Sequence, residues 1–168
     1  MKTPRILIMC TGNSCRSQMA EGLLRQAAGD LIEVHSAGTN PVGYVHPLAI
    51  EVMAQAGIDL STHTSKHYAQ FVSKGIDTVI TVCDEAREAA SLLFEGSRHF
   101  HWPFGNPSKD VRGSETILDA FRRIRSEISP VFQAYAAGYT QAKTTEETAP
   151  ACSGHPRPRP VMALHVLP

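Results

Sequence analysis

An uninterrupted apolar run near the N-terminus constrains the fold of this chain more than any other feature. Residues 6–9 read Ile-Leu-Ile-Met without a polar position, which is typical of a strand covered on both faces in a parallel sheet. After a short polar loop, Met19, Leu23 and Ala27 recur at the spacing of one helix face. Gly29 is a natural stop for that helix. The segment therefore predicts a strand, a tight loop and a helix in direct succession.

The alternation of strands and helices continues along the chain. Further strands are predicted over residues 32–36, over residues 78–83 and around Phe100 and Trp102. Further helices are predicted over residues 48–56, over residues 84–93 and from Ser114 onwards, where Pro130 should kink or shorten the helix. This order predicts an α/β fold with a doubly wound, four-stranded, mostly parallel sheet flanked by helices. Ligands of such sheets bind at the carboxyl ends of the strands.

Composition sets the domain organisation and the expected surroundings. Residues 1–138 are expected to form one folded domain, and residues 139–168 a disordered, proline-rich tail. The 16 basic and 16 acidic residues cancel, which excludes the broad basic surface of proteins that bind nucleic acid or anionic membranes. No signal peptide and no apolar run of the ~20 residues that span a bilayer are apparent. We therefore expect a cytoplasmic monomer whose partner is a small molecule or a protein.

The four cysteines are Cys10, Cys15, Cys83 and Cys152. A chain of this length can bury a sizeable core and does not need a disulfide framework. In a reducing compartment the cysteines are better interpreted as packing residues or as working thiols.

Residues 10–17 read Cys-Thr-Gly-Asn-Ser-Cys-Arg-Ser and join the predicted first strand to the predicted first helix. Unpaired backbone N–H groups and the positive end of the helix converge at such a junction, so the loop can hold a tetrahedral oxyanion. The same dipoles and the Arg16 guanidinium should favour the thiolate form of Cys10 and make it a nucleophile. Arg16 would also bind two oxygens of the anion. A buried structural cysteine followed by a surface arginine is the alternative interpretation. The predicted oxyanion-binding positions are Thr11, Gly12, Asn13, Ser14 and Cys15.

The segment from Cys10 to Gly22 resembles the signature of the thiol-dependent arsenate reductases, which are built on the fold of the low-molecular-weight protein tyrosine phosphatases. Similar stretches follow in the same order over residues 5–138, among them Ser36-Ala37-Gly38, Thr81-Val82-Cys83 and His101-Trp102-x-Phe104.

The resemblance implies a mechanism based on two thiols. Cys10 would attack arsenate, with Ser17 as a hydroxyl near the thiolate and with Arg16 and the loop amides holding the oxyanion. Cys83 would then attack Cys10 and release arsenite; a buried, inert Cys83 is the alternative. An external thioredoxin, glutaredoxin or small thiol would restore the thiols, without a bound cofactor or metal. The pair His99 and His101 lacks further ligands with which to hold a metal.

Asn13, Glu21 and Ser36 match positions that support the loop and bind a potassium ion in some members of the family that this chain resembles. Lys66 stands where those members have an acidic ligand. We hypothesise that its ammonium group supplies the positive charge or abolishes ion binding. Glu21 and Arg25 are also expected to pair on the outer face of the first helix, because they are four residues apart.

Two departures from the family pattern bear on activity. Asn106-Pro107 replaces the Asp-Pro that carries the general acid, and a carboxamide cannot deliver a proton. Asp110 in the same loop is either a substitute or an ordinary loop residue. The third cysteine of thioredoxin-coupled members is also missing from residues 89–91, which read Ala-Ala-Ser. Either the external reductant acts directly on the Cys10–Cys83 pair, or Cys152 takes part.

Three functions therefore remain open from the sequence. The first is arsenate reduction through Cys10 and Cys83. The second is phosphomonoester hydrolysis by a low-molecular-weight protein tyrosine phosphatase, against which Asn106 argues. The third is a non-catalytic oxyanion or redox sensor. Cys15 has two interpretations: a protective disulfide with Cys10, implied by the resemblance, or a packing role.

Overall fold

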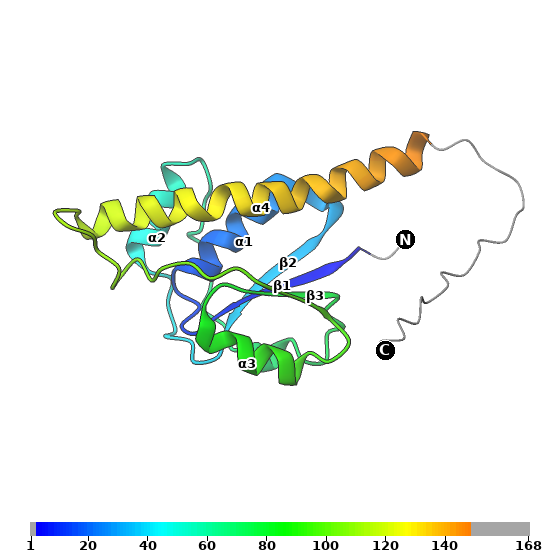
Figure 1. Ribbon diagram of the computed structural model, residues 1–168, viewed down its shortest axis with the longest axis horizontal. Coiled ribbons are helices and arrows are strands. Elements are labelled where there is room, and N and C mark those ends of the chain that lie inside the picture. The colour runs from blue at the N-terminus through cyan, green and yellow to red at the C-terminus, as the bar shows by residue number, and fades with distance from the viewer. Residues whose placement is uncertain (1–2, 149–168) are drawn as a thin grey trace, which may run out of the picture.

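The computed structural model describes residues 3–148, and the side chains of residues 3–141. Its centre is a four-stranded sheet in the order β2-β1-β3-β4, in which every neighbouring pair is parallel (Figure 1). The predicted fold class is confirmed. The strands are β1 (Arg5–Cys10), β2 (Glu33–Gly38), β3 (Thr78–Thr81) and β4 (Arg98–His101). The helices are α1 (Arg16–Ala28), α2 (Pro47–Ala54), α3 (Asp84–Leu93) and α4 (Ile117–Thr148), with short 3-10 turns at Gly29–Leu31 and Tyr68–Gln70.

Helices cover both faces of the sheet. Figure 1 shows α1, α2 and α4 on one face and α3 on the other. The apolar run of β1 lies between these layers, and Ile6, Leu7, Ile8 and Met9 are all fully buried. A strand with two covered faces has no position at which a polar residue could reach water, which explains the uninterrupted run. The central strand therefore fixes where its carboxyl end, Cys10, is placed.

Helix α4 runs without a break through Pro130 to Thr148, so the expectation that Pro130 shortens it is wrong. A proline inside a helix costs about 3 kcal/mol or more. The apolar face of α4 outweighs that cost, because Phe121 and Phe132 are fully buried and each such side chain contributes about 1.5–3 kcal/mol.

The helix also passes the boundary predicted between residues 138 and 139. Tyr139 packs edge-on against Tyr135, with ring centroids 5.5 Å apart, and residues 139–148 contain neither proline nor glycine to end the helix. The helix is therefore longer at this end than the sequence suggested. The rest of the predicted tail, residues 149–168 with Cys152, lies outside the described residues. Over residues 3–148 no helix is both long and apolar enough to cross a membrane.

Several element ends differ from the prediction by a few residues. Strand β3 ends at Thr81, and Cys83 instead caps the N-terminus of α3. Strand β4 ends at His101, before Trp102. Helix α2 begins at Pro47, because the His46 side chain accepts a hydrogen bond from the Leu48 backbone N–H. Ala27, predicted on the inner face of α1, is exposed.

Candidate active site

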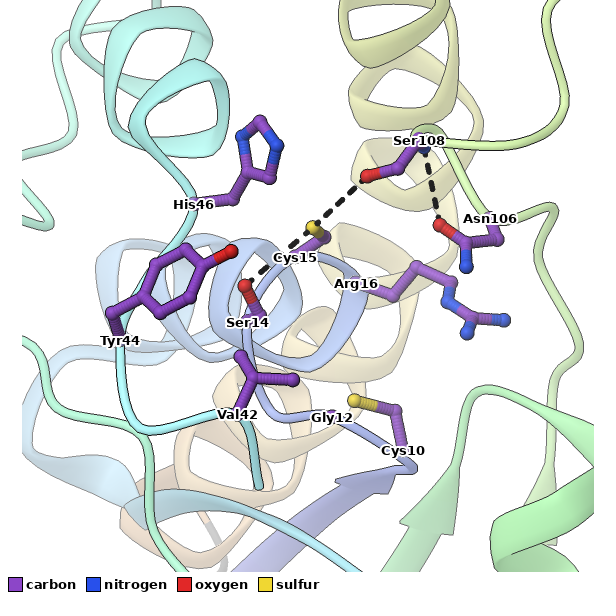
Figure 2. A pocket seen from close by; sticks show the side chains of 10 residues that line it. All are labelled: Cys10, Gly12, Ser14, Cys15, Arg16, Val42, Tyr44, His46, Asn106 and Ser108. Atoms are coloured by element: carbon purple, nitrogen blue, oxygen red, sulfur yellow. Dashed lines mark hydrogen bonds between the residues drawn. The ribbon is translucent and has the colours of Figure 1, made fainter. Parts of the chain in front are cut away.

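A cavity of about 180 Å³ opens at the carboxyl end of β1, where sheets of this type bind ligands. Figure 2 shows Cys10 at its base, with the loop of Val42, Tyr44 and His46 on one side and the loop of Asn106 and Ser108 on the other. Sites for drug-sized ligands measure about 300–1,000 Å³, so this cavity suits a smaller ligand. Its lining residues are Cys10, Gly12, Ser14, Cys15, Arg16, Val42, Tyr44, His46, Asn106 and Ser108.

Cys10 is the last residue of β1, and 3% of it is exposed. The backbone N–H of Asn13 donates a hydrogen bond to its sulfur at 3.1 Å. The Ser17 Oγ lies 3.0 Å from the same sulfur. A backbone N–H and a side-chain hydroxyl therefore both lie within hydrogen-bond distance of this sulfur.

Asn13 holds the loop in its conformation from beneath the cavity. Within residues 3–148 it is the only residue other than glycine with a positive φ, 45°, and it is fully buried. Its Nδ2 donates to Ser17 Oγ at 2.9 Å and to Ser36 Oγ at 2.8 Å. Its Oδ1 accepts from the Lys66 backbone N–H at 2.7 Å and from Gln18 Nε2 at 3.0 Å. These four bonds offset the cost of the unusual backbone conformation.

Gly38 at the end of β2 gives the loop the space it needs. It lies opposite Cys10 in the parallel register of β1 and β2. A Cβ at this position would lie 2.4 Å from the Thr11 carbonyl oxygen and 3.0 Å from the Asn13 backbone nitrogen. Only glycine therefore lets the loop approach β2 this closely.

Arg16 begins α1 and faces the cavity above Cys10 (Figure 2). Its Nη1 donates a hydrogen bond to the Phe104 carbonyl at 3.0 Å, which holds the guanidinium at the cavity wall. Gly12, Ser14 and Cys15 line the same space. Thr11 does not line it; its hydroxyl contacts Cys83 instead. A cationic fork beside a loop at a helix N-terminus is suited to a tetrahedral anion.

Cys83 lies next to this loop at the end of the neighbouring strand. The Val82 backbone N–H donates to the Met9 carbonyl at 2.9 Å, and the Cys83 sulfur lies 3.4 Å from Thr11 Oγ1. Burial raises the pKa of the Cys83 thiol, while contacts with Thr11 and the Ala86 backbone oppose that shift. The cysteines at positions 10 and 83 are free and sit at the carboxyl ends of adjacent chain segments.

Cys15 is a free, half-buried thiol in the cavity wall. Its sulfur lies 3.9 Å from both Ser14 Oγ and Ser108 Oγ. Burial raises the pKa of the Cys15 thiol, and the hydrogen bonds to these serines oppose that shift. The thiol form is therefore favoured.

Comparison with known proteins identifies the family. The profile of the family described as low molecular weight phosphotyrosine protein phosphatase matches residues 5–143. The chain belongs to this family. The resemblance read from the sequence is thus confirmed at the family level.

Relatives within the low molecular weight phosphatase family include proteins named for another reaction. An arsenate reductase of Halalkalibacterium halodurans is 38% identical over 131 residues, which cover 78% of this chain and 94% of that protein. A solved structure titled as an arsenate reductase in the phosphate binding state is 28% identical with a TM-score of 0.66, covering 81% of this chain and 98% of the other. A thioredoxin-dependent arsenate reductase of Corynebacterium glutamicum is 25% identical with a TM-score of 0.62, covering 84% and 64%.

Asn106, which the sequence resemblance places where an acid is expected, lies in the cavity wall. Its Oδ1 accepts a hydrogen bond from the Ser108 backbone N–H at 3.1 Å. Asp110, the possible substitute, is not among the cavity-lining residues. Its carboxylate binds Arg112 at 3.1 Å and Arg123 at 3.4 Å, and hydrogen bonding to Arg112 lowers the pKa of Asp110. An ionised carboxylate turned to two arginines is unsuited to donating a proton in the cavity.

The prediction that Glu21 lies on the outer, solvent-facing side of α1 is wrong. Glu21 pairs with Arg25, at 2.6 Å, but only 2% of its side chain is exposed. The second oxygen, Oε2, accepts from Ser36 Oγ at 2.5 Å and lies 4.0 Å from Lys66 Nζ. The i,i+4 spacing predicted the pair and could not predict its burial, because residues 63–66 cover it from a distant part of the chain.

The two histidines of β4 bind groups within the protein. His99 Nε2 lies 3.0 Å from the Phe94 carbonyl. His101 lies 2.8 Å from Thr81 Oγ1 and 2.9 Å from Asp84 Oδ1 through its two ring nitrogens. Among the residues that the structure describes, no group of three or more His, Cys, Asp or Glu side chains is arranged to hold a metal ion.

Four cavity-lining residues were not predicted: Val42, Tyr44, His46 and Ser108. The first three come from the segment that follows β2, and a loop after the carboxyl end of a parallel strand was a signal that could have found them. Val42 and Tyr44 are 52% and 56% exposed, so they form an apolar rim at the mouth of the cavity. Ser108 had no comparable signal.

Proposed function

We propose that this protein is an enzyme that reduces arsenate to arsenite. The observation that carries the proposal is a free thiol, Cys10, in a small cavity that also holds Arg16, with a second free thiol, Cys83, 3.4 Å from the hydroxyl of the adjoining loop residue Thr11. A phosphatase needs only the first thiol, whereas reduction by two electrons needs both. The named activity of a relative 38% identical over most of both chains supports the same reaction.

The reaction uses the cavity in two steps. Arsenate binds with its oxygens on Arg16 and on the backbone N–H groups of the loop. The Cys10 thiolate attacks arsenic, and one arsenate oxygen leaves as water after protonation, which gives a Cys10–S–As(V) adduct. The Cys83 thiol loses its proton to solvent and attacks the Cys10 sulfur. The S–S bond forms, the S–As bond breaks, and its electron pair stays on arsenic, which leaves as arsenite.

The Cys10–Cys83 disulfide must then be reduced by two external thiol groups. We assign this step to a thioredoxin-like protein or a small thiol that attacks the disulfide directly. In the described part of the chain, α3 contains no cysteine beyond its cap, and Ala90 on its inner face is buried. The thioredoxin-dependent neighbour supports a protein reductant. Because the disulfide must be reduced after every turnover, a reducing compartment such as the cytoplasm is favoured. We expect the protein to act there as a monomer.

The disulfide formed in one turnover tests the proposal. The reduced protein is mixed with arsenate in the absence of external thiol, trapped with an alkylating agent and mapped by mass spectrometry. We expect one arsenite and one Cys10–Cys83 disulfide per chain. Cys10→Ser should form neither, and Cys83→Ser should form no such disulfide. Arsenite without this disulfide, or a disulfide that contains Cys152 in its place, would contradict the assignment of Cys83.

Phosphomonoester hydrolysis is the second candidate function, and the family description favours it. It would proceed through a phosphorylated Cys10 and would not need Cys83. Asn106 weighs against it, because loss of a general acid costs about 10²–10⁴ in rate when the leaving group needs a proton. A Cys83→Ser variant that hydrolyses aryl phosphates as fast as the unmodified chain, with no arsenite formed by either, would favour this candidate. Anion binding without either product would favour a sensor.

A further inference from the structure

The segment between β4 and α4 holds the arginine of the cavity. We call its residues 104–116 the wall loop. The Phe104 carbonyl accepts the hydrogen bond from Arg16 Nη1 at 3.0 Å, and the Phe104 backbone N–H donates to the Val82 carbonyl at 3.2 Å. Figure 2 shows the next part of the wall loop, Asn106 and Ser108, beside Arg16. The position of the wall loop at Phe104 therefore determines where the Arg16 guanidinium is held.

Arg123 of α4 binds the wall loop from outside the cavity. Its Nη2 donates to the Asp110 carbonyl at 2.6 Å, and its Nη1 donates to Asp110 Oδ2 at 3.4 Å. Its Nε and Nη2 donate to the two carboxylate oxygens of Glu115 at 3.0 and 3.2 Å. Its Nη1 also donates to Glu127, one turn further along α4, at 3.2 Å. One guanidinium thus joins the middle and the end of the wall loop to the helix.

The contact between Arg123 and Glu115 is of a kind that fixes a geometry. Isolated ion pairs at a protein surface contribute little, whereas bidentate pairs and networks of several charges hold their members in place. Only 21% of the Arg123 side chain and 15% of the Glu115 side chain are exposed. Hydrogen bonding to Arg123 lowers the pKa of the Glu115 carboxyl, so this carboxyl is ionised at neutral pH.

Asp110 transmits this restraint to Phe104. The Asp110 backbone N–H donates to the Asn106 carbonyl at 2.7 Å. The Asp110 carboxylate packs against the backbone of Gly105, where an added Cβ would overlap with its Oδ2. Gly105 directly follows Phe104 in the chain. A shift of Asp110 away from α4 would therefore release the two residues that follow the Phe104 carbonyl.

We propose that Arg123 is a positioning residue of the anion site, which holds the Phe104 carbonyl, and through it the Arg16 guanidinium, in the orientation that binds the anion. The inference rests on the proposed function, in which Arg16 binds arsenate oxygens. A guanidinium has five N–H groups, and the bond to Phe104 uses one of them. Two others on the same planar fork can bind two oxygens of a tetrahedral anion. Without Arg123 the wall loop has several arrangements, and the apparent affinity falls with the fraction of molecules in the binding one.

The affinity for inorganic phosphate, measured by titration calorimetry on the full reduced chain, tests this role. We expect Arg123→Gln to weaken phosphate binding about tenfold, which corresponds to a binding arrangement present in about one tenth of the molecules. Arg122→Gln is the matched control, because it removes the same charge from the neighbouring residue of α4, which pairs with Asp119 and Gln55 instead. It should leave the affinity unchanged. An unchanged affinity in folded Arg123→Gln, or an equal loss in Arg122→Gln, would overturn the proposal.

Glu115 separates positioning from the long-range effect of charge. Removal of a carboxylate near an anion site would, by Coulomb attraction and repulsion alone, strengthen phosphate binding. We expect Glu115→Ala to weaken it about threefold instead, because the end of the wall loop is released while Arg123 keeps its bonds to Asp110. Glu127→Ala removes a carboxylate that binds Arg123 from α4 itself, and it should not weaken binding. Stronger binding in Glu115→Ala, or an equal loss in Glu127→Ala, would overturn the proposal.

Circular dichroism shows whether each variant is folded. If Arg123→Gln is not, Arg123→Lys replaces it. One ammonium group cannot reproduce the fork that binds Asp110 and Glu115 together, so the affinity must still fall, and an unchanged affinity would overturn the proposal. Phosphate is not reduced in this experiment, so the two proposals fail separately. A chain with the expected phosphate affinities that forms no arsenite would contradict the proposed function alone, and arsenate reduction with an unchanged affinity in Arg123→Gln would contradict this inference alone.

Discussion

An Asn106→Asp variant should hydrolyse phenyl phosphate about 10²–10⁴ times faster than the unmodified chain, the range attributed to one positioned general acid. Asn106 lines the same cavity as Cys10 and Arg16, and its Oδ1 accepts a hydrogen bond from the Ser108 backbone. A carboxylate oxygen can accept that bond equally well, so the loop should keep its conformation. The variant would then hold every group that a phosphatase needs: nucleophile, anion clamp and acid.

The leaving group distinguishes acid catalysis from a general improvement of the site. The gain should be large for phenyl phosphate, whose phenolate is a poor leaving group, and small for nitrophenyl phosphate, whose leaving group needs little protonation. Asn106→Ala should show no gain with either ester, and Cys10→Ser/Asn106→Asp should show no activity. Steady-state rates for the two esters measure this directly. An equal gain for both would mean that the introduced carboxyl group acts on binding rather than as an acid.

The sequence alone predicted the parts of this protein that local patterns determine. The apolar run of β1, the loop from Cys10 to Arg16 and the start of α1 are contiguous, so spacing places them together. The parallel sheet then brings Cys83 to the same edge, because adjacent parallel strands end on one side. A nucleophile, an anion clamp and a second thiol could therefore be located from the order of the residues, although their roles remain proposals.

Features that depend on distant segments were missed or misread. Glu21 was expected in solvent because helical spacing shows only its partner on α1, whereas β2 and residues 63–66 bury it. Pro130 was expected to kink or shorten α4, because the local cost of proline is visible in the sequence. The helix instead continues to Thr148, and the burial of Phe132 that offsets this cost is not visible in the sequence. Tyr44 reaches the cavity from a loop without regular structure. In each case tertiary packing decided the outcome.

A Gly38→Ala variant should lose arsenate reduction by about 10² or more, the cost of a displacement of ~1 Å in a catalytic group. The added Cβ would meet the Thr11 carbonyl oxygen at 2.4 Å and the Asn13 backbone nitrogen at 3.0 Å. Both are backbone atoms of the anion-binding loop, which cannot rotate away as a side chain could. The loop must therefore move from β2, and overpacking of this kind also costs about 1–3 kcal/mol of the free energy of unfolding.

Gly138 offers a matched control because the same substitution meets nothing there. It lies in α4, and a Cβ at this position has no atom within 4 Å. Gly138→Ala should raise the free energy of unfolding by about 0.5–1 kcal/mol, since alanine favours a helix over glycine, and should leave arsenate reduction unchanged. Chemical denaturation and initial rates measured on both variants separate stability from loop geometry. A Gly38→Ala variant that is destabilised yet fully active would contradict this prediction. The close contact of the loop with β2 would then stabilise the fold without positioning the loop, and the hydrogen bonds of Asn13 would have to position it alone.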